Sequence, residues 1–238
     1  SHELRTPLNA IIGFSDMIRL NYAGDVSDRA KNYAEDIYMS GMHLLSLVNS
    51  ILDTSRIELG ESELRESEFP IGPILDEVSD MMSLGLPQKH LKLLQPDRDA
   101  PLRDAVLFAD RNATKQMMIN LVTNAIKFTQ RGGFIELQLT EGPQGSLDVI
   151  VRDTGIGIPK EDLPRIQNAF ERGSNHGSMG SDGGVIDGVG LGLSITKALM
   201  DHHDGTILIE STVGEGTTVT LSFPAARRRD TPSKATPE

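Results

Sequence analysis

A histidine and a glutamate stand side by side at His2 and Glu3, and a threonine follows at Thr6. Because the pKa of histidine is about 6.5, the side chain is largely neutral at pH 7 and one ring nitrogen can attack phosphorus. The adjacent carboxylate can accept the proton on the other ring nitrogen and stabilise the developing positive charge. Thr6 comes four residues after His2, so both lie on one face of a helix. The three residues suit a histidine that receives a phosphoryl group; the alternative is a surface His-Glu pair.

Two asparagines and a lysine, Asn120, Asn124 and Lys127, recur at helical spacing and project from one face of a helix. An amide oxygen is a neutral ligand that Mg²⁺ accepts, and a lysine on the same stripe can meet phosphate oxygens. Both asparagines are therefore candidate metal ligands. The alternative is a polar stripe facing solvent. It is weakened by a separate apolar stripe on the same helix, formed by Met117, Leu121 and Ile126.

An aspartate followed by two glycines, Asp153, Gly155 and Gly157, comes directly after an alternating apolar segment. A carboxylate at the end of a strand can accept the amino group of adenine, and glycines let the backbone approach a base without a Cβ in the way. An Asp-Gly turn alone is usually only a turn. The full form Asp-x-Gly-x-Gly-Ile-Pro after a strand favours recognition of adenine over guanine.

A second glycine segment, Gly188, Gly190, Leu191 and Gly192, opens the helix expected over 191–202. Backbone N–H groups at a helix start suit phosphate oxygens. A dinucleotide-binding fold is rejected because the segment does not follow a strand in a βαβ unit. Thr217 and Thr218, after Gly214 and Gly216, are expected to begin the last strand and support the site.

Five segments thus follow one another in a fixed order. They are residues 1–9 (SHELRTPLN), 120–129 (NLVTNAIKFT), 153–159 (DTGIGIP), 188–193 (GVGLGL) and 214–217 (GEGT). In this order they resemble the core of the bacterial two-component sensor histidine kinases, and the resemblance runs from His2 to about residue 223. The catalytic domain of that family belongs to the gyrase/Hsp/histidine-kinase/MutL superfamily and has the Bergerat-type ATP-binding fold.

The resemblance implies ATP and Mg²⁺ as cofactors, autophosphorylation of His2, and transfer of the phosphoryl group to an aspartate of a response regulator receiver domain. It also implies a homodimer, an ATP lid over residues 173–184, and a role for Thr6 in positioning water for regulator dephosphorylation. Phe170-Glu171-Arg172 matches the family's segment before the lid, but its second aromatic residue is missing. Two alternatives remain open. One is an ATPase or serine kinase of the same superfamily in which the hairpin only dimerises, and the other is a non-enzymatic ATP-binding scaffold.

Apolar residues at heptad-like spacing in residues 4–18 and again in 37–51 predict two amphipathic helices separated by residues 21–28. A lone hairpin cannot bury both apolar seams, so two copies are expected to form a four-helix bundle. The expected organisation is therefore an all-α hairpin over 1–65 for dimerisation and phosphorylation, a catalytic ATP-binding domain over 66–225, and a disordered tail over 226–238.

The second domain is expected to be an α+β two-layer sandwich with helices on one face of a mixed sheet. Its predicted helices cover about 71–84, 112–129 and 191–202, and its predicted strands cover 90–94, 105–109, 134–140, 147–152, 206–210 and 217–223. The stretch 58–68 is only noted as acidic. No role is predicted for the remaining histidines, which are His43, His90, His176, His202 and His203.

Composition narrows the possible partners of this chain of 238 residues. Its net charge of −11 argues against nucleic-acid binding, which needs clustered lysine and arginine. The absence of cysteine excludes disulfides and thiolate zinc sites. No apolar run approaches the roughly 20 residues that cross a bilayer, so we expect no membrane contact and a cytoplasmic location. Since the chain opens at its most reactive motif, we expect a fragment of a longer protein that is inner-membrane anchored or soluble.

Overall fold

The computed structural model describes residues 2–20, 24, 26–27, 29–31, 33–34, 37–38, 41, 64–83, 86, 89–168, 171 and 191–229. For residues 2–7 and 101 only the backbone is described. The chain divides into two compact units, Ser1–Ser62 and Glu63–Glu238. Each unit is treated by itself below.

The first unit is helical. Helix α1 spans His2–Arg19, and the described residues of the segment 29–41 are all helical. The two helices pack closely where a Cβ on Gly41 would lie 2.7 Å from the side chain of Ile12. Of the expected apolar seam, Leu8 is buried, whereas Ile11 and Ile37 are each about half exposed. Leu44, Val48 and Ile51 lie outside the described residues.

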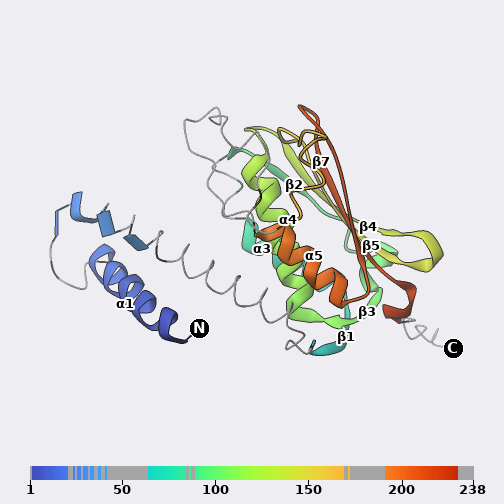
Figure 1. The fold of residues 1–238 in the computed structure, drawn as a ribbon, viewed down its shortest axis with the longest axis horizontal. Helices are drawn as coiled ribbons and strands as arrows, with labels where there is room; N and C mark the ends of the chain where they lie inside the picture. The colour runs from blue at the N-terminus through green and yellow to red at the C-terminus, as the bar shows by residue number, and fades with distance from the viewer. Residues whose placement is uncertain are drawn as a thin grey trace. The chain divides into compact units, whose positions relative to one another are not determined.

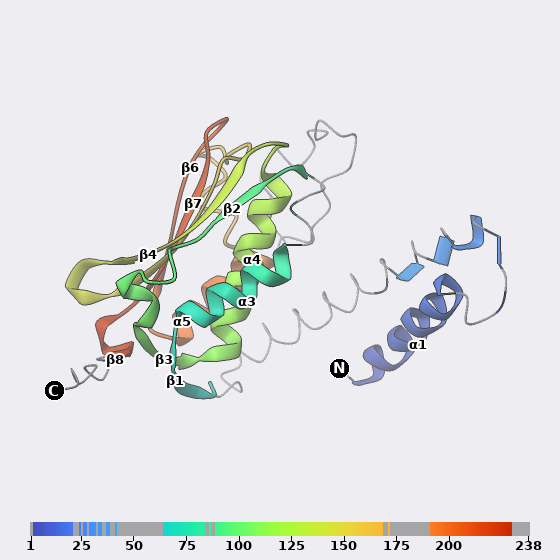
Figure 2. The ribbon, with the colours of Figure 1, turned by 180° about the vertical axis from the view of Figure 1, so that it is seen from behind.

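The second unit has a five-stranded sheet in the order β2-β4-β5-β7-β6 (Figure 1). The strands are β2 (Lys92–Leu94), β4 (Phe134–Glu141), β5 (Leu147–Asp153), β6 (Thr206–Thr212) and β7 (Gly216–Phe223). Strand β2 is parallel to β4 and every other pairing is antiparallel, so the sheet is mixed. Three helices, α3 (Gly72–Met82), α4 (Arg111–Phe128) and α5 (Gly192–His202), cover one face of it (Figure 2). This is the expected α+β arrangement.

Alternation along the central strands explains which face the helices cover. Val149 and Val151 of β5 and Val219 and Leu221 of β7 are buried, whereas the residues between them are more exposed. The facing side of α4 supplies a matching apolar stripe, formed by Met117, Met118, Leu121, Val122 and Ala125. Each of the valine, leucine and methionine side chains contributes roughly 1.5–3 kcal/mol when it is fully buried. The core therefore lies between the sheet and the helices.

The ends of α4 are set by hydrogen bonds that place it against the sheet. Asp110 ends the preceding strand and accepts hydrogen bonds from the backbone N–H groups of Asn112 (2.9 Å) and Ala113 (3.0 Å). An aspartate at this N-cap position satisfies donors that the helix leaves unpaired. The helix begins one residue before the predicted boundary and ends one residue earlier, at Phe128.

A second, three-stranded antiparallel sheet has the order β1-β3-β8. It consists of β1 (Glu66–Pro70), β3 (Val106–Asp110) and β8 (Arg228–Arg229). Strand β1 was not predicted, because its residues are acidic and only Phe69 of the strand is buried. Its pairing with β3, from Glu66 opposite Asp110 to Pro70 opposite Val106, joins segments about 40 residues apart, and local sequence carries no signal for it.

The expectation of a disordered tail from residue 226 is wrong for residues 226–229. Arg227 ends a short 3-10 helix, Ala225–Arg227, and Arg228 and Arg229 pair with β3. The physical reason is ion pairing: Arg227 contacts Glu66, Arg228 lies 3.0 Å from Glu141, and Arg229 lies 3.4 Å from Glu68. The basic run is thus fixed by carboxylates on β1 and β4. Residues 230–238 lie outside the described residues.

Candidate nucleotide-binding site

Asp153 ends β5 with one carboxylate oxygen anchored and the other open. Oδ1 accepts hydrogen bonds from the backbone N–H groups of Gly155 (2.7 Å) and Thr217 (3.3 Å). Among the described residues, Oδ2 has no hydrogen-bond partner. Burial raises the pKa of the Asp153 carboxyl, and the two backbone hydrogen bonds oppose that rise only in part. The carboxylate is therefore held in a fixed orientation, with one oxygen available to a hydrogen-bond donor.

The two glycines after Asp153 are required by the packing of the protein itself. A Cβ on Gly155 would lie 2.7 Å from the carbonyl oxygen of Phe128, and a Cβ on Gly157 would lie 2.0 Å from the carbonyl oxygen of Thr212. Gly157 also has a φ of +70°, which side chains disfavour. Both positions thus need glycine to let the turn pack against the end of α4 and the β6–β7 hairpin. The space on the Cβ side of each glycine is filled by protein backbone, so packing alone requires glycine here, and the approach of a base to this turn stays a prediction.

The predicted asparagine stripe on α4 meets the start of α5. Asn120 Nδ2 donates to the carbonyl oxygen of Gly192 at 3.3 Å, and Asn120 Oδ1 accepts from Gln116 Nε2 at 2.9 Å. A Cβ on Gly192 would lie 3.6 Å from Asn124 Nδ2, which is ordinary contact. Among the described residues, the amide of Asn124 has no hydrogen-bond partner. The structure brings Asn120, Asn124 and Gly192 together, with the amide of Asn124 open.

The first turn of α5 has no side-chain cap. Its N-cap residue is Leu191, which makes no capping hydrogen bond through its side chain. The N–H groups at the start of the helix are therefore suited to an anion. Gly188 and Gly190 lie outside the described residues, as do residues 173–184, which were expected to form a lid.

Lys127 lies with its ammonium 5.0 Å from the centre of the Phe128 ring. A cation over an aromatic face is stabilised by the ring quadrupole. The sequence placed this lysine on the asparagine stripe and expected it to meet phosphate. In the structure the lysine packs on its neighbour at the last turn of α4, and its contact with phosphate stays a prediction.

A second lysine, Lys89, was missed by the sequence reasoning. Its Nζ donates to the carbonyl oxygens of Lys127 (2.8 Å), Ile126 (3.0 Å) and Thr129 (3.4 Å). It therefore caps the end of α4, where the helix leaves carbonyl groups unpaired. The backbone also links this end to the Asp153 turn, because Ile156 N–H donates to the Phe128 carbonyl at 3.2 Å. No local pattern marks Lys89, since its partners lie 37 to 40 residues away.

The remaining expected positions are distributed as follows. Thr217 supports Asp153, but Thr218 pairs with the exposed Arg152 and Glu210 and faces away from the helices, which corrects its expected role. His203, for which no role was predicted, is fully buried and bridges Asp110 and Leu199.

The side chains of His2, Glu3 and Thr6 lie outside the described residues, although the backbone of α1 begins at His2. A groove of about 270 Å³, lined by residues 94–96 and 136–140, contains none of the site residues.

Two negative findings bear on cofactors and membranes. Within the described residues, no three or more histidine, aspartate or glutamate side chains gather so that they could hold a metal ion. None of the helices in that part of the chain has both the length and the apolar character to span a bilayer.

A mixed sheet covered on one face by helices, with an anchored aspartate at the end of a central strand, defines an ATP-binding domain of the Bergerat type. Comparison with known families agrees. Residues 109–227 match the family model described as histidine kinase-, DNA gyrase B-, and HSP90-like ATPase, and residues 1–60 match the His Kinase A (phospho-acceptor) domain. The chain therefore belongs to this ATPase family, and the phospho-acceptor domain before it identifies a histidine kinase core.

Individual relatives point the same way. The chain is 42% identical over 224 residues to histidine protein kinase DivJ of Caulobacter vibrioides, covering 94% of this chain and 36% of DivJ. It is 36% identical over 236 residues to the cell-division control histidine kinase PdhS of Brucella anthropi, covering 95% of this chain and 22% of PdhS. The chain thus spans about a third or less of the length of these two relatives.

Solved structures also match. Full-length ShkA in complex with AMPPNP superposes with a TM-score of 0.76 at 29% identity, covering 94% of this chain and 44% of ShkA. The catalytic domain of histidine kinase ThkA superposes with a TM-score of 0.56 at 26% identity, covering 68% of this chain and 97% of that domain.

Proposed function

We propose that this chain is the catalytic core of a sensor histidine kinase, which transfers the γ-phosphoryl group of ATP to His2 and then to an aspartate of a response regulator. The observation that carries the proposal is the Asp153 carboxylate, anchored through Oδ1 and open at Oδ2, in the same unit as the junction of α4 and α5. The histidine kinase relatives and the phospho-acceptor domain support it.

ATP fits the residues of the second unit as follows. The open Oδ2 of Asp153 accepts a hydrogen bond from the exocyclic amino group of adenine. The uncapped start of α5, with Gly188, Gly190, Leu191 and Gly192, binds phosphate oxygens through backbone N–H groups. Gly155 and Gly157 hold the Asp153 turn in place, and Lys127 at the end of α4 adds positive charge. These contacts position the nucleotide, which is the main contribution a protein makes to phosphoryl transfer.

The group available to coordinate Mg²⁺ is the side-chain amide of an asparagine, not a cluster of carboxylates. The described residues offer no group of three acidic or histidine side chains, whereas the amide of Asn124 is open beside the start of α5. We assign Asn124 as the direct ligand. The Asn120 amide is hydrogen-bonded to Gln116 and to Gly192, so it positions the start of α5. It is also a candidate ligand. When bound, the ion would neutralise charge on the phosphate oxygens.

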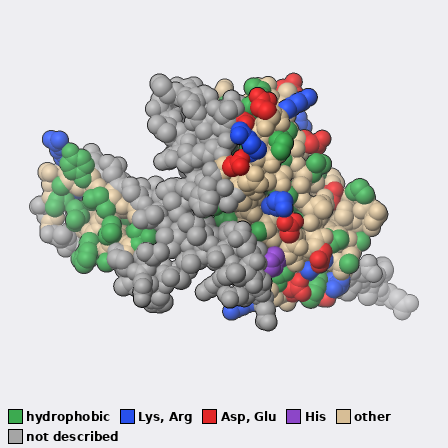
Figure 3. All heavy atoms as spheres, in the orientation of Figure 1, with side chains coloured by type: hydrophobic (Ala, Val, Ile, Leu, Met, Phe, Trp, Pro, Cys, Tyr) green, Lys and Arg blue, Asp and Glu red, His purple; other side chains and the backbone are tan. Residues whose placement is uncertain are grey.

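The hairpin supplies the acceptor. His2 acts as the nucleophile, Glu3 orients its ring and accepts its proton, and Thr6, one turn later, positions water for dephosphorylation of the regulator. The hairpin also forms a homodimer. Its described apolar side chains are exposed at helical spacing, with Ile11 at 50% and Phe14 at 67% exposure, and they gather on one face of the unit (Figure 3). A second hairpin would bury that face in a four-helix bundle.

The test is incorporation of γ-labelled phosphate from Mg²⁺-ATP into the purified chain and into His2→Ala. The half-buried His202, on α5, gives the matched control His202→Ala. The proposal requires a label that is acid-labile and base-stable, absent from His2→Ala and retained in His202→Ala. Addition of a receiver domain should then remove the label. ATP binding without any label on His2 would favour the ATPase or scaffold alternative.

A further inference from the structure

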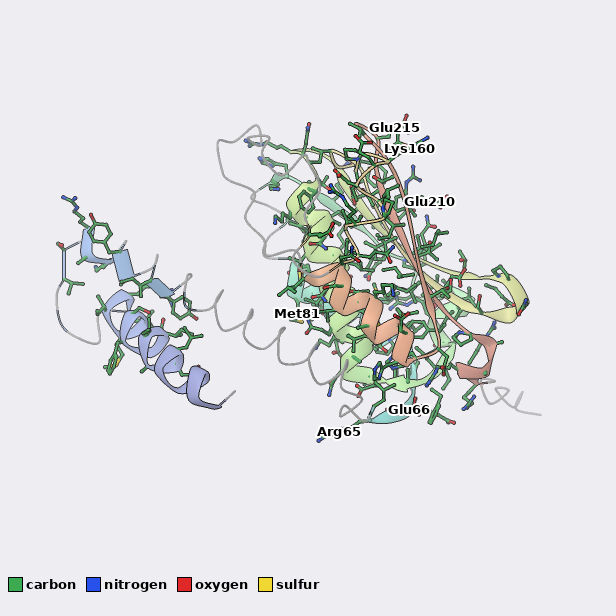
Figure 4. The ribbon with its side chains drawn as sticks, in the orientation of Figure 1. Arg65, Glu66, Met81, Lys160, Glu210 and Glu215 are labelled. Atoms are coloured by element: carbon green, nitrogen blue, oxygen red, sulfur yellow. The ribbon has the colours of Figure 1, made fainter. Side chains whose placement is uncertain are left out.

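Three polar side chains lie in one row across the sheet at the nucleotide end. Asp153 of β5 is opposite Thr217 of β7, and Thr217 is opposite Ser211 of β6. Directly opposed residues on neighbouring strands point to the same face. Two residues along each strand, Val151 and Val219 are buried against the helices, so the row lies at the end of the helix-covered face. Figure 4 labels Glu210 and Glu215 on the β6–β7 hairpin around this row, with Lys160 of the neighbouring segment at the same end.

The hydroxyl of Ser211 has all of its hydrogen-bonding capacity in use. It donates its single proton to the carbonyl oxygen of Gly216 at 2.9 Å, because a carbonyl oxygen only accepts. It accepts a hydrogen bond from the backbone N–H of Ile158 at 2.8 Å. Its remaining lone pair faces Thr217 Oγ1 at 2.9 Å. A hydroxyl has one donor and two acceptor sites, so Ser211 is saturated.

This count fixes the direction of the Thr217 hydroxyl. Since the only proton of Ser211 goes to Gly216, the hydrogen bond between the two hydroxyls is donated by Thr217. The outward side of Thr217 Oγ1 then carries only lone pairs. Its neighbour Asp153 presents a carboxylate oxygen, which also only accepts when ionised. The pair forms an edge made of acceptors alone.

We propose that Ser211 is a positioning residue for base selectivity: it orders the Thr217 hydroxyl so that the Asp153–Thr217 edge accepts the amino group of adenine and repels the 6-keto oxygen of guanine or hypoxanthine. The inference rests on the proposed binding of adenine at Asp153. Asp153 and the glycine turn alone do not exclude a keto base, because a freely rotating Thr217 hydroxyl would donate to the keto oxygen. Ser211 acts through Thr217 and contacts no substrate itself.

The experiment measures the dissociation constants of ATP and inosine triphosphate for the full chain and its variants. Inosine triphosphate replaces the 6-amino group by a keto oxygen and is otherwise close to ATP, so the ratio of the two constants reports on this edge. In Ser211→Ala the ratio should fall about tenfold, which corresponds to one hydrogen bond gained by the keto base. Ser211→Thr, which keeps the hydroxyl, should restore the ratio. Thr218→Ala, on the opposite face, should leave it unchanged.

Thr217→Val provides a second measurement if Ser211→Ala does not fold. It leaves Ser211 satisfied by Ile158 and Gly216, and it should also lower the preference for ATP. In that background Ser211→Ala should change the ratio no further, because the hydroxyl it orders is gone. An equal loss of affinity for both nucleotides in Ser211→Ala, or an unchanged ratio in Thr217→Val, would refute the role of Ser211. If the unmodified chain binds neither nucleotide, the proposed function fails instead.

Discussion

The Asp153 carboxylate and the backbone N–H of Gly155 are joined by a 2.7 Å hydrogen bond at the end of β5. The bond closes the turn that leads away from the strand, and it fixes one oxygen so that the other is open. Burial raises the pKa of this carboxyl, because it disfavours the ionised form. At neutral pH the ionised Asp153 carboxylate therefore lowers the stability of the fold. An isolated charge that lowers stability is typical of a functional site.

The first prediction follows from that cost. In Asp153→Asn the amide oxygen still accepts from Gly155 and Thr217, while the other atom becomes a donor. We expect the affinity for ATP to fall about 10- to 100-fold, since hydrogen bonds to charged groups contribute roughly 1.5–3 kcal/mol. The midpoint of thermal unfolding without nucleotide should stay the same or rise, because a buried charge is removed. Calorimetric titration and thermal unfolding check both points, with the exposed Asp201→Asn as control. Unchanged ATP affinity would contradict the assignment of Asp153.

The second prediction concerns pH. In the folded chain Asp153 binds its proton more readily than in the unfolded chain, where its pKa is about 3.8. Asp153 therefore contributes its full stabilisation below pH 3.8, and this contribution is lost as the pH rises through the higher pKa of the folded state. ATP binding has the opposite dependence, because the base requires the ionised carboxylate. ATP affinity should weaken as pH falls toward the folded pKa, and this dependence should be absent in Asp153→Asn. A parallel decline in the variant would assign it to another group.

Sequence reasoning succeeded where structure depends on spacing within one segment. Local periodicity predicted helix α4 and the alternating strands, and a short motif predicted that an aspartate ends β5. It failed where partners lie far apart in the chain. Three features depend on pairings across the fold: strand β1, the ordered arginines after residue 226, and the capping of α4 by Lys89. Residue type alone does not reveal such partners, because an acidic run and a basic tail both read as solvated segments.

Ser211 illustrates the same limit at the site. In the sequence Ser211 directly follows the predicted strand 206–210, and no role was predicted for it. Only the register of β6 with β7 places its hydroxyl against Thr217 and Ile158. The packing reason for the two glycines was likewise invisible in the sequence, because the atoms that a Cβ would meet belong to α4 and the β6–β7 hairpin.

The third prediction concerns the buried His203. Its Nδ1 donates to the Leu199 carbonyl at 2.7 Å and its Nε2 accepts from the Asp110 N–H at 3.1 Å, which requires the neutral ring. Burial lowers the pKa of His203 below its ordinary value of 6.5; the hydrogen bond to Leu199 opposes this, the charge of Arg227 adds to it, and the charges of Asp110 and Glu66 oppose it. The unfolded state therefore binds the proton more readily than the folded state. The contribution of His203 to the free energy of unfolding is full above pH 6.5 and is lost as the pH falls below that value.

His203→Leu should remove that loss of stability below pH 6.5 while leaving the Asp110 N–H without its acceptor. We expect a cost of about 1–3 kcal/mol in the free energy of unfolding at neutral pH. Urea unfolding of the chain and the variant between pH 5 and 8 gives both quantities, and His202→Leu is the control from the neighbouring position. If the slope with pH persists in His203→Leu, another group is responsible for it.

The fourth prediction concerns Arg227, whose side chain is 13% exposed. It pairs with Glu66 at the start of β1, lies 3.1 Å from Asp204, and donates to the Phe108 carbonyl at 3.3 Å. Figure 4 labels Glu66, the first residue of β1. Arg227→Ala should lower the free energy of unfolding by about 1–3 kcal/mol, because it leaves partly buried acceptors unpaired. The loss should shrink in 1 M salt.

Arg228→Ala is the matched control for Arg227. Its partner Glu141 is more than half exposed, and exposed ion pairs contribute at most about 1 kcal/mol. Urea unfolding should therefore separate the two variants clearly. Equal effects at the two positions would mean that the basic segment contributes only general charge, with no specific anchoring of β1.

The last prediction joins the end of α4 to the nucleotide site through Lys89. Its ammonium donates to three carbonyl oxygens, of Ile126, Lys127 and Thr129, and a cation at this end of a helix contributes roughly 0.3–1 kcal/mol and up to about 2 kcal/mol when partly buried. Lys89→Met, which keeps most of the side-chain length, should lower the free energy of unfolding by about 1 kcal/mol. Because Thr129 forms a β-bridge with Gly155, loosening this end should also weaken ATP binding by a few-fold. Lys92→Met, an exposed lysine on β2, is the control and should change neither quantity. Loss of stability with ATP affinity intact would show that the cap supports the helix alone, and that the Asp153 turn is held by its own hydrogen bonds.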